Sequence, residues 1–210
     1  QMFNFLKKTK EPRQLFFSTD VHCHIVPGVD DGSPDVDTSM ELLERMASWG
    51  LKRIIATPHM TLDTFENTPD ILDPALEDLK DALDRPNLGI EISRTAEHRL
   101  DDFFMAQLEK GAIVPYPNNY LLVETSFVQE PWGLDRTLFD LKLRGYKPVM
   151  AHPERFRYYQ EGRERYAQLH QAGNLFQVNI LSLAGYYGKS TKQMAEWLVE
   201  NGMVDFLGTD

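Results

Sequence analysis

The sequence predicts an α/β protein in which short parallel strands alternate with helices. Short apolar runs recur along the 210 residues, and most are followed by a segment with apolar residues at helical spacing. Seven strand–helix units in one chain favour a barrel related to the (β/α)8 TIM type, and an open sheet is the alternative. We expect residues 1–14 to form an N-terminal arm and residues 15–210 to form a single domain.

Each predicted element has a local reason. Ser33 and Pro34 are typical of a helix N-cap and first helical position, and Gly50 is typical of a helix end. Glycines 145, 173 and 202 punctuate later helix ends in the same way. Strands are expected at 15–21, 53–57, 89–96, 120–123, 148–151, 175–178 and 204–207. Helices are expected at 34–49, 71–83, 100–108, 134–143, 163–171 and 192–199.

Composition and charge exclude several classes of protein. The chain has 22 Lys and Arg against 32 Asp and Glu, for a net charge of −10, which argues against a broad nucleic-acid or anionic-membrane surface. One cysteine excludes a disulfide scaffold and a four-cysteine zinc site. No apolar run approaches the roughly 18 residues of a membrane span, and the N-terminal sequence does not resemble a secretory signal. We therefore expect a cytoplasmic protein with no direct membrane insertion.

Histidines and carboxylates follow six of the seven predicted strands. In parallel β/α barrels the carboxyl ends of the strands meet at one face, where active sites lie. We therefore expect these side chains to gather at one place. They are His22, His24, His59, Glu97, Glu124, His152 and Asp210.

This set of residue types predicts a metal site. His22 and His24 are two apart, so both imidazoles project from one face of a strand. Clustered carboxylates repel one another and resist ionisation unless cations accompany them. Mixed imidazole and carboxylate ligands suit Zn, Mn or Fe. Because the cluster holds more ligands than one tetrahedral ion needs, we expect two or three metals with a bridging carboxylate.

Other reactive residues have weaker patterns. Cysteine-dependent phosphatases carry an Arg six positions after the nucleophile, but Val29 stands there relative to Cys23, so we expect a buried structural cysteine. Arg155 follows His152 by three residues and could bind phosphate oxygens in a bidentate fork. A surface pairing of Arg155 with Glu154 or Glu161 is equally compatible with the spacing. We expect His98 and His170 to be structural.

The ordered motifs resemble the PHP (polymerase and histidinol phosphatase) superfamily. They are His22-x-His24, Pro27-Gly-x-Asp-Asp31-Gly32, Ala56-Thr-Pro-His59, Ala96-Glu97, Val123-Glu124, Ala151-His-Pro-Glu-Arg155 and Gly208-Thr-Asp210. Within that superfamily they are most similar to the bacterial metal-dependent protein-tyrosine phosphatases of capsule and exopolysaccharide operons. The resemblance covers nearly the whole chain from about residue 15. It implies a distorted (β/α)7 barrel with three metals, commonly Mn.

The resemblance also implies roles for single residues. One metal would be held by His22, His24, Glu97 and Asp210. A second would share the bridging Glu97 with Glu124 and His152, and a third would be bound by Asp31 and His59. Arg155 would hold the substrate phosphate, with His152 and Glu97 beside it in the catalytic machinery. In the family pattern a further His ligand follows one residue after the Asp of Gly-Thr-Asp, so we expect a C-terminal tail that continues past Asp210.

The function implied is hydrolysis of phosphotyrosine. The expected substrate is the phosphorylated, tyrosine-rich tail of a cognate bacterial tyrosine kinase that controls capsular or exopolysaccharide synthesis. Two alternatives stay open at this point. One is a small-molecule phosphatase of the histidinol-phosphate type, and the other is a catalytically silent metal-binding module that docks on a kinase.

Overall fold

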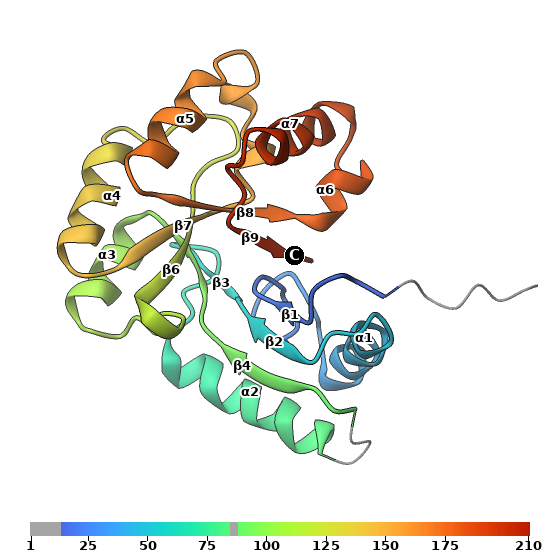
Figure 1. Ribbon diagram of the computed structural model, residues 1–210. Helices are drawn as coiled ribbons and strands as arrows, with labels where there is room; N and C mark the ends of the chain where they lie inside the picture. The colour runs from blue at the N-terminus through green and yellow to red at the C-terminus, as the bar shows by residue number, and fades with distance from the viewer. Residues whose placement is uncertain (1–13, 85–87) are drawn as a thin grey trace, which may run out of the picture.

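The computed structural model describes residues 14–84 and 88–210, which form an α/β fold of parallel strands. A three-stranded sheet has the order β1-β2-β4, and a six-stranded sheet has the order β3-β5-β6-β7-β8-β9. Every pairing between these strands is parallel. Figure 1 shows the strands curling around a central space, with the helices outside. The strands are β1 (Thr19–Asp20), β2 (Arg53–Ala56), β3 (His59–Met60), β4 (Glu91–Arg94), β5 (Glu97–Arg99), β6 (Tyr120–Glu124), β7 (Lys147–Ala151), β8 (Leu175–Asn179) and β9 (Phe206–Gly208).

Two strands of the first sheet continue into the second. The chain passes from β2 to β3 through Thr57 and Pro58, and from β4 to β5 through Thr95 and Ala96. Backbone hydrogen bonds bridge the break, from Thr95 N to Ala56 O at 2.9 Å and from Glu97 N to Pro58 O at 3.0 Å. Because proline has no N–H, Pro58 cannot continue the ladder, and β3 and β5 begin beyond the ends of the strands predicted at 53–57 and 89–96. The break puts Glu97 inside β5 rather than after a strand end.

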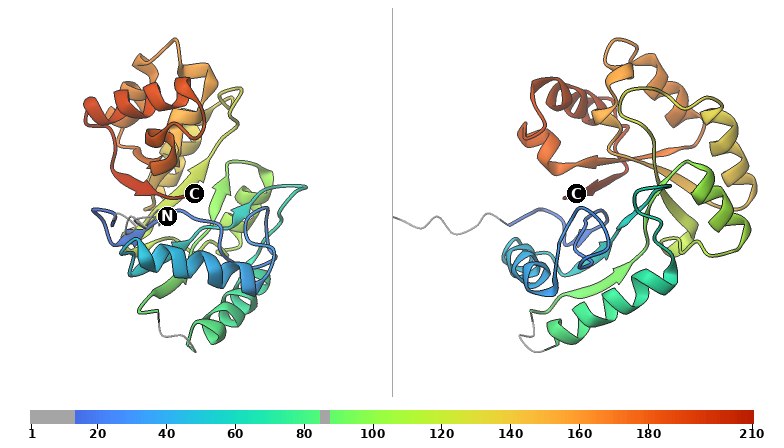
Figure 2. Two further views of the ribbon diagram at one scale, coloured as in Figure 1. Left: turned by 90° about the vertical axis from the view of Figure 1, so that its right-hand side faces the viewer. Right: turned by 180° about the vertical axis from the view of Figure 1, so that it is seen from behind.

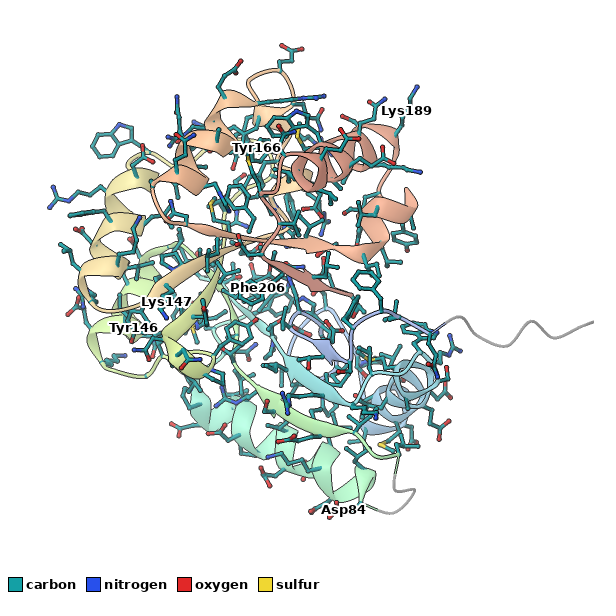
Figure 3. All side chains as sticks on the ribbon, in the orientation of Figure 1. Asp84, Tyr146, Lys147, Tyr166, Lys189 and Phe206 are labelled. Atoms are coloured by element: carbon teal, nitrogen blue, oxygen red, sulfur yellow. The ribbon has the colours of Figure 1, made fainter. Side chains whose placement is uncertain are left out.

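The central strands are buried on both faces, as parallel strands covered by helices are. In β6, β7 and β8 every residue after the first is buried. Tyr166 of α5 (Glu164–Gln171) illustrates the packing outside them, because its ring lies against Phe176 of β8 and Trp197 of α7 (Lys189–Glu200) (Figure 3). The second sheet is therefore held by a continuous apolar layer beneath its helices.

The helices cover the outside of the curled strands (Figures 1 and 2). Helices α1 (Val36–Ser48) and α2 (Pro69–Leu83) pack with the first sheet around Leu43, Leu76 and Leu79. Helices α3 (Asp102–Glu109), α4 (Leu134–Leu143), α5 and α7 cover the second sheet. The sequence did not predict α6 (Ile180–Ala184), which has only five residues, or the 3-10 turns at Pro117–Asn119, Pro153–Arg155 and Arg157–Tyr159.

The start of α1 corrects the sequence-based prediction. The N-cap is Asp35, whose side chain accepts from Thr38 N at 2.8 Å, and the helix begins at Val36. Ser33 Oγ instead donates to Asp35 O, so this serine orders the approach to the helix. The predicted end is confirmed, because Gly50 follows the helix with a φ of +91° that favours glycine.

The first predicted strand is also shorter than expected. Only Thr19–Asp20 pair with β2, because Leu15 N donates to Trp49 O and the chain there follows the end of α1. Of the predicted N-terminal arm only Gln14 lies within the described residues. Within 14–84 and 88–210 no helix is both long and apolar enough to cross a membrane.

The last strand ends beside the first. Asp210 N donates to His22 O at 2.7 Å, and Thr209 N donates to a carboxylate oxygen of Asp20 at 3.1 Å. Asp20 is fully buried and also accepts from His22 N. These contacts bring the carboxyl ends of β1 and β9 to the same place.

Candidate active site

Glu97 lies at the centre of a buried cluster of imidazoles. Its Oε1 lies 2.7 Å from His152 Nε2, and its Oε2 lies 3.3 Å from the Nε2 atoms of both His22 and His24. The same Oε2 lies 3.2 Å from His59 Nδ1. One carboxylate from β5 therefore contacts four histidines that come from three other parts of the chain.

The remaining predicted ligands join this cluster at its edges. Asp210 Oδ1 lies 3.5 Å from His22 Nε2 and 3.3 Å from His24 Nε2. Glu124 Oε1 lies 3.4 Å from His59 Nδ1, and Asp31 Oδ1 lies 3.6 Å from His59 Nε2. The structure thus brings all eight predicted ligands into one network of contacts. Glu124 contacts His59, whereas the family resemblance implied that it shares an ion with His152.

Two of the histidines have their tautomers set by neighbours. His22 Nδ1 donates to Gln177 Oε1 at 2.7 Å, and His24 Nδ1 donates to Asp30 Oδ2 at 2.8 Å. Each ring therefore directs the lone pair of Nε2 into the cluster, and these two Nε2 atoms are 3.3 Å apart. Two lone pairs facing each other beside carboxylates form a donor set for a cation.

Unpartnered buried atoms support the same conclusion. Glu97 Oε2 and His59 Nδ1 are buried and make no hydrogen bond to any described residue. Such atoms are rare in native proteins and call for a missing partner. The potential ligands form four overlapping groups, and within each group the donor atoms all lie within 4.8 Å of one another. These groups are His22–Glu97–His152, His22–His24–Asp210, His24–His59–Glu97 and His24–Asp30–Asp31, and the residues present therefore fit divalent metal ions.

The electrostatics of the cluster favour positive charge. Burial acts to lower the pKa of His22, but attraction to Glu97 and Asp210 outweighs it and raises that pKa to about 9. The pKa of His24 is raised as well, because its contacts with the carboxylates of Asp210, Asp30 and Glu97 outweigh the effect of burial. Burial would raise the pKa of Glu97, yet His22 and His152 hold it well below its usual range. The field at this point therefore stabilises cations.

Close backbone contacts hold two of the histidines. A Cβ on Gly208 would lie 2.6 Å from His22 Cβ, and a Cβ on Gly32 would lie 2.2 Å from His24 O. Neither position can carry a side chain without moving its histidine. His152 has a φ of +33°, which is sparsely populated for a residue with a Cβ. The strain is located where β7 ends and the Pro153–Arg155 turn begins.

Arg155 faces the same cluster. Its Nη1 lies 3.1 Å from Asp210 Oδ2, and its guanidinium lies over the rings of Phe127 and Tyr187, at 4.5 and 4.4 Å from their centroids. Arg155 does not pair with Glu154, although the sequence left such a surface pairing open as an alternative to phosphate binding. Glu154 is buried and accepts from Asn179 N and Ser182 Oγ. Arg155 therefore directs its charge toward the cluster.

The cluster opens into a cavity of about 540 Å³. This volume is within the range of small-molecule sites and is sufficient for an aryl phosphate. Predicted site residues make up much of the polar part of its wall, together with Ser33, Thr38, Arg45 and Thr209. The predicted site residues are His24, Asp31, His59, Glu97, Glu124, His152, Arg155 and Asp210.

Comparison with known proteins identifies the family. Residues 18–210 match the model of the family described as capsular polysaccharide synthesis, CpsB/CapC. The chain belongs to the CpsB/CapC family. Its relatives include the tyrosine-protein phosphatase YwqE of Bacillus subtilis, 32% identical over 192 residues, which cover 91% of this chain and 76% of YwqE. The tyrosine-protein phosphatase CpsB of Streptococcus agalactiae is 28% identical over 199 residues, covering 91% of this chain and 81% of that protein.

A solved structure of the CpsB/CapC family has the same fold. The structures of YwqE from Bacillus subtilis and CpsB from Streptococcus pneumoniae, described as unique metal-dependent tyrosine phosphatases, include a chain that matches with a TM-score of 0.85. That match is 32% identical and covers 91% of this chain and 78% of the other. The similarity confirms the family to which the motifs pointed and the mixed α/β architecture.

Sequence reasoning missed the residues that orient the cluster in this CpsB/CapC chain. Asp30 accepts a hydrogen bond from the His24 ring and another from His59 N at 3.0 Å. The motif had predicted the neighbouring Asp31, and not Asp30, as a functional residue. Gln177 orients His22, and the side-chain amide of Asn179 donates to Asp210 Oδ2. A buried glutamine inside an apolar predicted strand is a signal that could have identified Gln177.

His98, His170 and Cys23, which we expected to be structural, have contacts that fit structural roles. His98 Nδ1 donates to Leu122 O at 2.8 Å, and burial lowers the pKa of His98 to about 4. His170 contacts Asp205 on the surface. Cys23 is buried, and both burial and the nearby Asp20 raise the pKa of its thiol, which opposes a role as a thiolate nucleophile.

Proposed function

We propose that this chain is a metal-dependent phosphomonoesterase that hydrolyses phosphotyrosine in proteins. The observation that carries the proposal is a buried cluster of imidazoles and carboxylates that shares one cavity with Arg155. Such a cluster can bind metal ions, and a guanidinium beside it can bind phosphate oxygens. The relatives named as tyrosine-protein phosphatases support the choice of substrate.

We propose that two or three divalent ions bind here, with Mn favoured and Zn or Fe as alternatives. The proposed ligands are His22, His24, Asp31, His59, Glu97, Glu124, His152 and Asp210, and the tautomers of His22 and His24 support their part in it. Ions bound at these residues would lower the pKa of water, to supply a nucleophile at neutral pH, and would neutralise charge on the phosphate. Glu97, with an oxygen near each of four imidazoles, is the natural bridging ligand.

The chain's own residues bind and orient the phosphate. Arg155 holds phosphate oxygens in a bidentate fork, and Phe127 and Tyr187 keep its guanidinium plane in place. Asp210 Oδ2 bonds the same guanidinium, while Asp210 Oδ1 faces His22 and His24. One carboxylate thus aligns the arginine with the metal ligands. The leaving group is a tyrosine phenolate with a pKa of about 10, which departs with little help from an acid.

We further propose the finer architecture and the cellular setting. The hydrogen bond from Asp210 N to His22 O supports closure of the strands into a distorted (β/α)7 barrel, with residues 15–210 as one domain. The proposed partner is the tyrosine-phosphorylated tail of a bacterial kinase that controls capsular or exopolysaccharide synthesis. Phosphotyrosine is made from ATP, so the proposed location is the cytoplasm.

The experiment is hydrolysis of p-nitrophenyl phosphate and of a phosphotyrosine peptide by metal-stripped protein with and without Mn. We expect turnover that requires the metal, falls at least 1000-fold in Glu97→Gln and persists in Cys23→Ala. The cysteine variant is the matched control, since Cys23 also lines the cavity but has no proposed role. Turnover without metal, or its loss in Cys23→Ala alone, would contradict the proposal.

The same assay separates the two alternatives. A histidinol-phosphate type of enzyme would hydrolyse small phosphate esters and reject the phosphopeptide. A silent docking module would bind Mn, measured by elemental analysis, and hydrolyse neither substrate.

A further inference from the structure

A second cavity adjoins the candidate active site. Its volume is about 440 Å³, and it shares Phe127, Arg155 and Tyr187 with the first cavity. Because these three side chains form a common wall, a polypeptide with one residue in the first cavity would lead its neighbours past the second. The residues that line the second cavity and not the first are Arg157, Gln160, Ser190 and Thr191.

The lining of this second cavity is cationic although the chain is acidic. It contains two guanidinium groups, three hydroxyls and one amide, and no carboxylate of the described residues lines it. The net charge of the chain is −10, so the sign of this lining is opposite to that of the chain as a whole. Arg155 is paired with Asp210, whereas the exposed Arg157 makes no ion pair with any residue in 14–84 or 88–210. Arg157 is thus free to meet an incoming anion.

A helix terminus adds to the positive character of the cavity. Ser190 and Thr191 lie in the first turn of α7, a helix of 12 residues. Its N-cap is Gly188, and within the described chain no side chain caps it. The first N–H groups of a helix carry partial positive charge and accept anionic partners. Figure 3 shows Lys189 at the same end of α7, close to this turn in sequence.

We propose that this cavity is a subsite for an anionic side chain, a carboxylate or a phosphate, that flanks the phosphotyrosine of a protein substrate. The inference rests on the proposed function and adds a preference for substrate sequence. Arg157 forms a charge-assisted hydrogen bond with the flanking anion, and Ser190 and Thr191 donate hydroxyls to it. The subsite would select acidic, or multiply phosphorylated, segments around the tyrosine.

The test compares three phosphotyrosine peptides that differ only at the residues flanking the tyrosine. These residues are glutamine, glutamate or phosphoserine. We expect kcat/KM of the wild-type protein to be about tenfold higher for the glutamate and phosphoserine peptides than for the glutamine peptide. The effect should lie mainly in KM and should shrink as salt is raised, because screening weakens an exposed ionic contact. The relative values for glutamate and phosphoserine distinguish the two sources of negative charge.

Variants assign the preference to this cavity. Arg157→Gln should lose the tenfold preference and retain hydrolysis of p-nitrophenyl phosphate, and Arg157→Lys should keep part of the preference. Arg136→Gln removes the same charge from the exposed face of α4 and is the matched control. The main-chain bond from Arg157 N to Phe127 O is unaffected by these changes, and circular dichroism checks folding.

Three results would overturn the inference. They are equal kcat/KM for the three peptides, equal effects of Arg157→Gln and Arg136→Gln, and a parallel loss of p-nitrophenyl phosphate hydrolysis in Arg157→Gln. If the wild-type protein hydrolyses neither ester nor peptide, the proposed function fails. Calorimetric binding of the three peptides then still decides whether the subsite discriminates among them.

Discussion

Gly208→Ala tests whether the backbone of β9 fixes the position of His22. The added Cβ would lie 2.6 Å from His22 Cβ and 3.2 Å from His22 N. Carbon atoms in contact are about 3.5–4.0 Å apart, so the two segments must separate by about 1 Å. A displacement of that size at a reacting centre costs about 100-fold in rate, and overpacking costs about 1–3 kcal/mol in stability. We therefore expect a folded protein with about 100-fold lower kcat/KM.

The measurements are kcat/KM for p-nitrophenyl phosphate at saturating Mn, the metal content and the melting temperature. Gly162→Ala is the matched control, since a Cβ there meets nothing within 4 Å among the described residues and its φ is not in the left-handed region. The reasoning is refuted if Gly208→Ala keeps its activity within threefold of wild type with a full complement of metal. It is also refuted if Gly162→Ala loses as much activity as Gly208→Ala.

Three further predictions concern single side chains. Arg155→Lys keeps the charge but loses the fork, so kcat/KM for p-nitrophenyl phosphate should fall about 100-fold at unchanged metal content, and a smaller loss of under fivefold would argue against a bidentate role. Asp30→Asn loosens His24, so Mn affinity should fall about 10- to 100-fold by titration, whereas unchanged affinity would show that Asp30 does not orient the ligand. His98 is buried and neutral, with its pKa lowered to about 4 from 6.5. Its contribution to stability is therefore complete above pH 6.5 and is lost as pH falls through 4, by at most about 3 kcal/mol. Urea unfolding at pH 7 and 4.5 should thus show a smaller pH dependence for His98→Gln than for wild type, and equal dependence would contradict the assignment.

The alternation of strands and helices was predictable because apolar runs and helical spacing are local signals. The change of sheet after Ala56 and Arg94 was not, because β3 and β5 have only two and three residues, and only pairing with neighbouring strands reveals them. The short α6 was missed for a related reason, since a five-residue helix has too few positions to establish a period.

The site was predictable where chemistry and position coincide. Histidines and carboxylates at strand ends must converge if the strands are parallel, which is why Glu97 and His152 could be expected to meet. The sequence does not say which ligand meets which, so the contact of Glu124 with His59 required coordinates. Partners such as Gln177 act through hydrogen bonds across 155 positions, and no local pattern encodes a pairing at that distance.

The two aromatic rings against Arg155 have a thermodynamic consequence. An arginine on an open surface samples many rotamers and loses that freedom when a ligand arrives. Here Phe127 and Tyr187 already restrict the side chain, so most of the ordering takes place during folding. Binding of an anion then carries a smaller entropic penalty, because the orientation of the Arg155 guanidinium is already set in the folded protein.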